Sequence, residues 1–225
     1  MSLIYNITPA ETMMVLNPSS CHLKELMKYT FIDLILKKVI KTTENSSLIN
    51  KKHNISSTVS SYVKIGKNFS SYRPKKHEFV FLTIFYKNRQ LKVLFKQYMK
   101  VIYNGINSEY DYKSAIHTSP DIQALYTTNF FSKLLRRHVI NDKGKLEQTK
   151  IYAVLKPIDN LIATGLKDKE SVQKMLSIGG NMFLLNNFSV ELLSKIDSMF
   201  KDLEFNQTTK DSNWNYYFDI FEDQI

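Results

Sequence analysis

The strongest constraint on the fold of this chain is an apolar pattern with the period of a helix, which runs from Leu23 to Val39. Its apolar residues recur three or four positions apart, and this spacing places them on one face of a helix that packs against a core. They are Leu23, Leu26, Met27, Phe31, Leu34, Ile35 and Val39. The chain has 225 residues, and a chain of that length buries about 70% of its unfolded surface. The sequence therefore predicts a helix-rich protein with its own core.

A shorter helix is predicted before this one, and its start is well marked. Thr8 can cap it, Pro9 fits the first helical position, and Glu11 completes a capping box three residues after the cap. The pair at residues 17–18, Asn-Pro, ends it. Further helices are predicted at 75–85, 89–103, 118–137, 158–164, 169–178 and 189–203.

Two hairpins are predicted between the helices. In the first, residues 39–43 (VIKTT) pair with residues 60–69, across a polar segment at 44–58 that we expect to be a loop. In the second, HVIND pairs with LEQTKIYAVL across a tight turn at 143–145, and Pro157 ends the returning strand. The expected fold class is therefore α+β and mainly helical.

The two halves of the chain follow one plan, in which aromatic residues, a Leu-rich helix end and two basic residues precede a Val-Ile strand. This similarity between KYTFIDLILKKVIKTTEN, from Lys28, and YTTNFFSKLLRRHVINDKGK, from Tyr126, predicts a tandem duplication. The order of helix, helix, hairpin and helix resembles a winged helix, most clearly over residues 130–166. Residues 152–157, YAVLKP, resemble the second strand of its wing.

This resemblance implies tandem winged-helix-like units with a C-terminal helical extension. The first unit covers residues 1–73, a helical linker and the second unit cover 74–166, and C-terminal helices with an acidic, aromatic tail cover 167–225. The stretches TPAE, FIDLILKKVI and KKHEFVFLTIF look similar to the cytosolic region of predicted bacterial membrane proteins of unknown function. That second resemblance implies no activity.

Positive charge gathers in the first half of the chain. Residues 1–110 carry 17 Lys and Arg against 6 Asp and Glu, whereas residues 111–225 carry 14 against 15. Basic residues cluster at two expected helix ends and on the second wing, where they could contact a polyanion such as nucleic acid or an anionic surface. They equally fit solvated helix ends, where cations favour the helix dipole. These residues are Lys37, Lys38, Lys41, Lys133, Arg136, Arg137, Lys143, Lys145 and Lys150.

The tail is both aromatic and acidic, with Trp214, Tyr216, Tyr217, Phe218 and Phe221 among carboxylates. Those carboxylates would repel the phosphates of single-stranded nucleic acid, so base stacking is disfavoured. Packing against the basic half of the chain, against a partner protein or against a second copy is the preferred interpretation.

No catalytic, cofactor-binding or metal-binding pattern is found in the sequence. One cysteine, Cys21, and scattered histidines do not provide the four patterned ligands of a zinc site, and we expect Cys21 to be a buried hydrophobe. The glycines form no phosphate-binding loop. The N-terminus lacks the features of a secretory signal, so we expect a cytoplasmic protein. The expected function is a non-enzymatic binding module for protein–protein interaction or scaffolding. The alternative is nucleic-acid binding through the basic helix ends and wing.

Overall fold

The computed structural model describes residues 2–51, 54–127, 138–165 and 169–188, with the side chains of residues 44–60 left out. The described fold is α+β and mainly helical, as the sequence predicts, and it contains one small antiparallel sheet. Its α-helices are α1 (Pro9–Leu16), α2 (Leu23–Leu36), α3 (Lys76–Lys87), α4 (Phe95–Asn104), α5 (Glu109–His117), α7 (Asp142–Ala163) and α8 (Lys169–Ser177). The strands are β1 (Ile40–Lys51), β2 (Asn54–Ile65) and β3 (Val93–Leu94), and the 3-10 helices are η1 (Leu3–Tyr5), η2 (Gln123–Leu125) and η3 (Gly179–Leu184).

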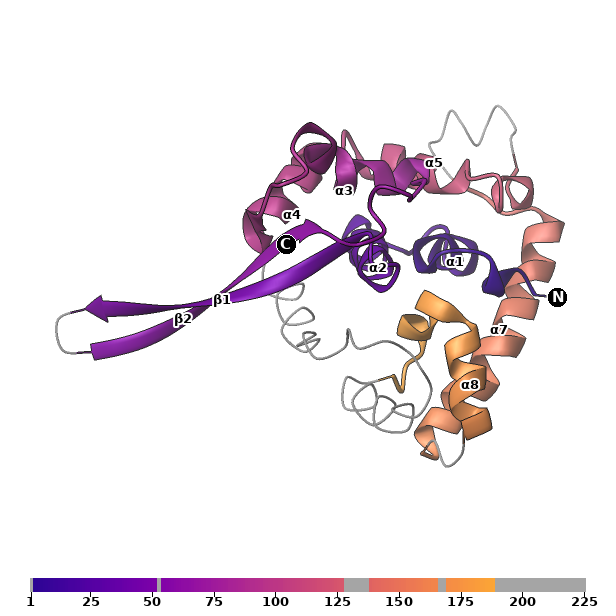
Figure 1. Ribbon diagram of the computed structural model, residues 1–225. Coiled ribbons are helices and arrows are strands. Elements are labelled where there is room, and N and C mark those ends of the chain that lie inside the picture. Colours follow the sequence, from indigo (N-terminus) through magenta and orange to yellow (C-terminus); the bar gives the residue numbers. More distant parts are fainter. Residues whose placement is uncertain (1, 52–53, 128–137, 166–168, 189–225) are drawn as a thin grey trace.

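The helices surround α1 and α2, and the hairpin projects away from them. Figure 1 shows α3, α4 and α5 along one side of these two helices, α7 and α8 along another, and the β1–β2 hairpin pointing into solvent. In α1 the side chains of Ala10, Met14 and Val15 are fully buried. A helix of only eight residues has little stability of its own, so the neighbouring helices must hold α1 in place.

The predicted starts of α1 and α2 are confirmed. The Thr8 side chain accepts a hydrogen bond from the backbone N–H of Glu11 at 3.2 Å, and the Glu11 carboxylate accepts one from the Thr8 N–H at 2.8 Å. The predicted apolar face of α2 is buried at Phe31 and Leu34, and the Phe31 ring packs edge-on against Phe95 at 5.3 Å between centroids. The first two helices therefore follow from local sequence patterns.

The first predicted hairpin is confirmed, but the expected loop at 44–58 is wrong. The pairing runs without interruption from Ile40 opposite Ile65 to Lys51 opposite Asn54. Backbone groups alone supply the hydrogen bonds of an antiparallel ladder, so a strand can form without a periodic side-chain pattern. β3 pairs only with Tyr62 and Val63 of β2. The rest of β1–β2 is a two-stranded ribbon, which we call the ribbon from here on.

The helices after the ribbon differ from prediction at their boundaries. α3 was expected at 75–85 and is confirmed, whereas α4 begins only at Phe95, because the two residues before it pair with β2. Gly105 caps the end of α4 with a φ of −80°, in the ordinary right-handed region. The helix predicted over 118–137 does not open at 118–120, where turns and η2 follow α5, and residues 128–137 lie outside the described part of the chain. Ser108 caps α5 by accepting a hydrogen bond from the Asp111 N–H at 3.1 Å.

The second predicted hairpin is wrong, because residues 142–163 form the single helix α7. The buried apolar side chains of α7 are spaced four, three and four apart across Pro157: Ile151, Leu155, Ile158 and Ile162. A helix buries all four on one face, whereas a hairpin ending before Pro157 would divide them. The side chain of Asn141 caps the helix by accepting from Gly144 N–H at 3.0 Å. The second unit of the predicted tandem duplication therefore has a helix where its wing was expected. The winged-helix resemblance remains a prediction for the first unit alone.

The chain after α7 returns to the N-terminus. Gly165 ends α7 with a φ of +83°, and α8 follows close to its predicted bounds. The Asn181 amide, in η3, donates to the carbonyls of Ile4 and Ile7 at 2.8 and 3.0 Å and accepts from the Thr12 hydroxyl at 2.6 Å. The predicted helix at 189–203 lies outside the described residues.

Candidate functional site

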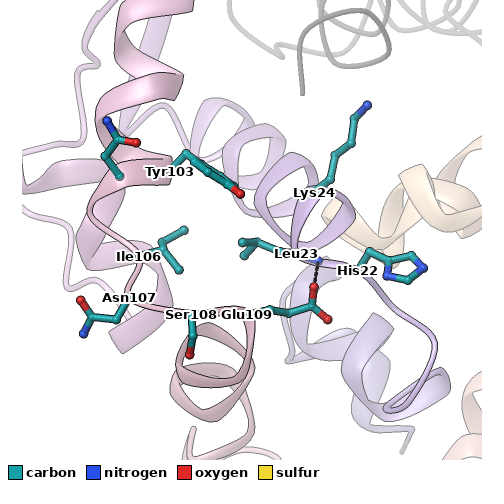
Figure 2. A pocket seen from close by; sticks show the side chains of 9 residues that line it. His22, Leu23, Lys24, Tyr103, Ile106, Asn107, Ser108 and Glu109 are labelled. Atoms are coloured by element: carbon teal, nitrogen blue, oxygen red, sulfur yellow. Dashed lines mark hydrogen bonds between the residues drawn. The ribbon is translucent and has the colours of Figure 1, made fainter.

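A shallow pocket of about 570 Å³ lies between the start of α2 and the connection from α4 to α5. Figure 2 shows Leu23 and Ile106 facing each other across it, with the Tyr103 ring above and the Glu109 carboxylate at its edge. The lining residues are His22, Leu23, Lys24, Tyr103, Asn104, Ile106, Asn107, Ser108 and Glu109.

The one carboxylate of this pocket has a structural role. Glu109 accepts a hydrogen bond from the Leu23 N–H at 3.3 Å, and its other oxygen pairs with the Lys113 ammonium at 2.7 Å. Burial opposes ionisation, but these two donors outweigh it and hold the pKa of Glu109 below its usual value. An ionised carboxylate is not available as a general acid, and the contacts of Glu109 with the Leu23 N–H and with Lys113 give it a structural role at the start of α2.

A partly buried ion-pair group joins α1 to the segment that enters α3. Lys75 lies between two carboxylates, with its ammonium 2.6 Å from Glu11 and 2.7 Å from Asp121. Burial would raise the pKa of Glu11, but the Lys75 charge and hydrogen bonds outweigh it and leave the pKa lowered. Because Glu11 also caps α1, this pair fixes the start of α1 against the segment that enters α3.

A second group of buried charges lies beside the first. Lys37 contacts Asp33 at 2.5 Å and Glu78 at 3.4 Å, and the Tyr72 hydroxyl donates to Glu78 at 2.8 Å. Burial raises the pKa of Asp33 to about 6 although Lys37 opposes it, because the charges of Glu78 and Glu11 also favour the protonated acid. These groups contact one another where α2 meets α3, so we assign them to the packing of these helices and not to ligand binding.

An imidazole and phenol cluster packs near Cys21. The rings of His117 and His138 are 4.6 Å apart, and Tyr110 stacks on His138 at 4.9 Å. Burial lowers the pKa of His138 to about 4, with help from the neighbouring His117 and Lys113. Cys21 is buried and its thiol lies 3.5 Å from the Met14 sulfur. Burial raises the pKa of this thiol, so it stays protonated and is a poor nucleophile.

The described part of the chain holds no group of three or more His, Cys, Asp or Glu that could bind a metal ion. Within the same ranges, no helix is both long enough and apolar enough to cross a membrane.

The predicted polyanion contacts do not come together as the sequence suggests. Lys37 is held by its two buried carboxylates. Three predicted wing residues lie on α7 instead, where Lys145 pairs with Asp142 and Lys150 with Glu147. Lys133, Arg136 and Arg137 lie outside the described residues, as do the tail residues Trp214, Tyr216, Tyr217, Phe218 and Phe221.

Two of the predicted lysines, Lys38 and Lys41, meet three others where the ribbon joins the helical body. Lys41 is the cross-strand partner of Lys64, Lys67 neighbours Lys38, and the Lys92 ammonium lies 4.4 Å from the centre of the Tyr62 ring. We call these five residues, Lys38, Lys41, Lys64, Lys67 and Lys92, the ribbon-base lysines. Sequence reasoning missed the last three because their proximity depends on the strand register.

Comparisons with known proteins place this chain in no family. No protein-family model, no curated protein and no solved structure matches it.

Proposed function

We propose that this protein is a non-enzymatic binding module that recognises other protein chains, a second copy of itself included, through the open edges of the ribbon. The single observation that carries the proposal is the extent of the unpaired edges. No described strand pairs with the outer edge of β1 over its twelve residues, and the outer edge of β2 is paired only at Tyr62 and Val63.

An open edge presents a row of backbone donors and acceptors that another strand can pair with. Twelve extended residues span roughly 40 Å. The sequence from Ile40 to Ile65 contains no proline, a residue that commonly blocks such edges. Because a two-stranded hairpin alone is marginally stable in water, an added strand would stabilise the ribbon as well as bind to it.

The proposal is tested by shortening the ribbon in register. Replacing residues 46–59 by Asn-Gly joins Asn45 to Ser60, which are cross-strand partners, through a favoured two-residue turn. Sedimentation equilibrium should show concentration-dependent association of the full chain and a monomer for the shortened chain, with equal helicity by circular dichroism. A full chain that stays monomeric, or a shortened chain that associates equally well, would contradict edge pairing between copies of this chain.

The tail gives a competing location for the same function. A chain that ends before residue 206 lacks all five aromatic tail residues and keeps the ribbon. It should associate like the full chain if the ribbon edges make the contact. Loss of association in this variant alone would assign the interface to the tail instead.

A further inference from the structure

The ribbon-base lysines place like charges close together in two rows. Lys41 and Lys64 are directly opposite in the antiparallel ladder and so share one face of the ribbon. Beyond them the two strands stay together, since the Gly66 N–H donates to the Val39 carbonyl at 2.8 Å. Lys38 and Lys67 follow on either side. Tyr62 shares the face of Lys64 by strand alternation, and it brings Lys92 to the same face.

Three of these lysines have no ion-pair partner among the side chains that the structure describes. They are Lys41, Lys64 and Lys67. The nearby buried carboxylates are bound to Lys37. From residue 38 to residue 76 the sequence has nine Lys or Arg and one acidic residue, Glu44. Like charges facing each other across strands destabilise a sheet, so this arrangement costs free energy in the isolated protein.

The backbone conformation of Lys38 also costs free energy at the base of the ribbon. It ends α2 with a φ of +56°, in the left-handed region, where the Lys38 N–H bonds to Ile35 and the Val39 N–H to Leu34. This is the helix-ending motif in which glycine is the usual residue. Burial lowers the pKa of Lys38, and the adjacent Lys67 charge lowers it further. A lysine held in a strained conformation beside another lysine is the kind of outlier that points to a binding role.

We propose that the ribbon-base lysines bind the phosphate backbone of nucleic acid without reading its base sequence. Lys41 and Lys64 lie on paired strands, whereas Lys38 and Lys67 lie just beyond the strand ends, three residues further along the chain on each side. Both pairs therefore contact one ligand only if that ligand repeats its negative charge. Lysine is a flexible point charge that neutralises phosphates and carries no planar donor set for base edges. This inference goes beyond the edge-pairing proposal, because it uses side chains on a ribbon face at its base rather than backbone groups along its edges.

The test measures how salt weakens binding of a labelled DNA duplex, by fluorescence anisotropy. If five lysines each neutralise one phosphate, log affinity should fall against log salt with a slope of about −4.5. The triple variant Lys41→Gln, Lys64→Gln and Lys67→Gln should reduce this to about −1.8. The corresponding arginine variants should keep the original slope, because they keep the charge.

The α7 lysines provide the matched control. The variant Lys143→Gln, Lys145→Gln and Lys150→Gln removes the same charge from a helix that Figure 1 shows on the opposite side of the body from the ribbon. Its slope should equal that of the unaltered protein. Equal losses in the two triple variants would mean diffuse attraction to net charge, and an unchanged slope in the ribbon-base variant would overturn the proposal.

Two further experiments distinguish nucleic-acid binding from membrane binding and from edge pairing. Binding to phosphatidylserine vesicles but not to DNA, with the same lysine dependence, would assign the surface to a membrane and refute the nucleic-acid proposal. The shortened ribbon keeps all five lysines and should bind DNA normally while losing self-association. The ribbon-base glutamine variant should show the reverse, so each proposal can fail alone.

Discussion

The buried imidazole of His77 makes a sharp prediction about how acid destabilises the fold. His77 is 1% exposed, and neither of its ring nitrogens has a hydrogen-bond partner in the part of the chain that the structure describes. Burial lowers its pKa from 6.5 to about 4, outweighing the nearby charges of Glu78 and Glu11. The folded protein therefore binds this proton less tightly than the unfolded chain does.

The sign and size follow from proton linkage. Above pH 6.5 the imidazole is neutral in both the folded and the unfolded protein, so the unfolding free energy is at its full value. As the pH falls from 6.5 toward 4, only the unfolded chain takes up the proton, and the unfolding free energy decreases. The difference of 2.5 pKa units corresponds to about 3 kcal/mol of unfolding free energy. Asp33 titrates in the same window with the opposite sign, since its pKa is raised to about 6. The pH profile of the unaltered protein alone therefore does not isolate His77.

The variant His77→Leu isolates the effect of His77 on the unfolding free energy, because Asp33 titrates in both proteins and its effect cancels when they are compared. Its unfolding free energy, measured by urea titration with circular dichroism, should be close to that of the unaltered protein at pH 7.5. As the pH falls to 4, the variant should become more stable than the unaltered protein by about 3 kcal/mol. Phe85→Leu, in the same helix and equally buried, is the control and should destabilise by a constant amount at every pH. Parallel curves for His77→Leu and the unaltered protein would refute the reasoning.

The remaining predictions concern the strained lysine, the buried carboxylates and the thiol. Lys38→Gly should leave the urea midpoint unchanged or raise stability by up to about 1 kcal/mol, since glycine adopts this φ without strain, while the DNA salt slope becomes about one unit shallower. Glu11→Gln should cost about 3 kcal/mol in chemical denaturation at neutral pH by breaking a buried pair. Asp33→Asn should cost less than about 1 kcal/mol, because ionising Asp33 is already unfavourable. Cys21 should resist alkylation in the folded protein and react fully in urea, as followed by mass spectrometry.

Local sequence signals predict the first part of the fold well. The Thr8 capping box and the apolar face that includes Phe31 are each decided by residues within a few positions of one another. The base of the hairpin is predicted for the same reason. The length of the hairpin is not predicted, because the Ser, Thr and Asn residues of 44–58 have the composition of a loop. The pairing of the strands is decided by backbone partners across the ribbon.

The error at α7 has a different cause. The pattern of residues 138–155 alone predicts two strands, and Pro157 predicts the end of the second one. Yet α7 continues through Pro157, and its buried face becomes visible only when Ile158 and Ile162 are counted with Ile151. A proline removes one backbone donor from a helix, and here the packing of four buried side chains compensates.

The candidate site was predicted in part, and the missing part depends on register. Lys38 and Lys41 are visible in the sequence as a basic helix end. Lys64 and Lys67 join them only through the pairing of Ile40 with Ile65, and Lys92 only through the Tyr62 ring. Lys37 and Lys38 are adjacent lysines in the sequence, but Lys37 forms ion pairs with two buried carboxylates. Charge clustering along a chain therefore does not by itself identify the cations that face a ligand.

The hydrogen bonds of Asn181 have a consequence for how the protein is made. This one amide completes the backbone of the first turn and reaches the Thr12 hydroxyl, across a sequence separation of 169 residues. During synthesis, the carbonyls of Ile4 and Ile7 and the hydroxyl of Thr12 gain these hydrogen bonds only after most of the chain has left the ribosome. Contacts of such long range slow folding, and apolar α1 would stay open to aggregation or chaperone capture in the interval. A nascent chain stalled before residue 181 should therefore hold α1 loosely, with its amides still open to solvent exchange.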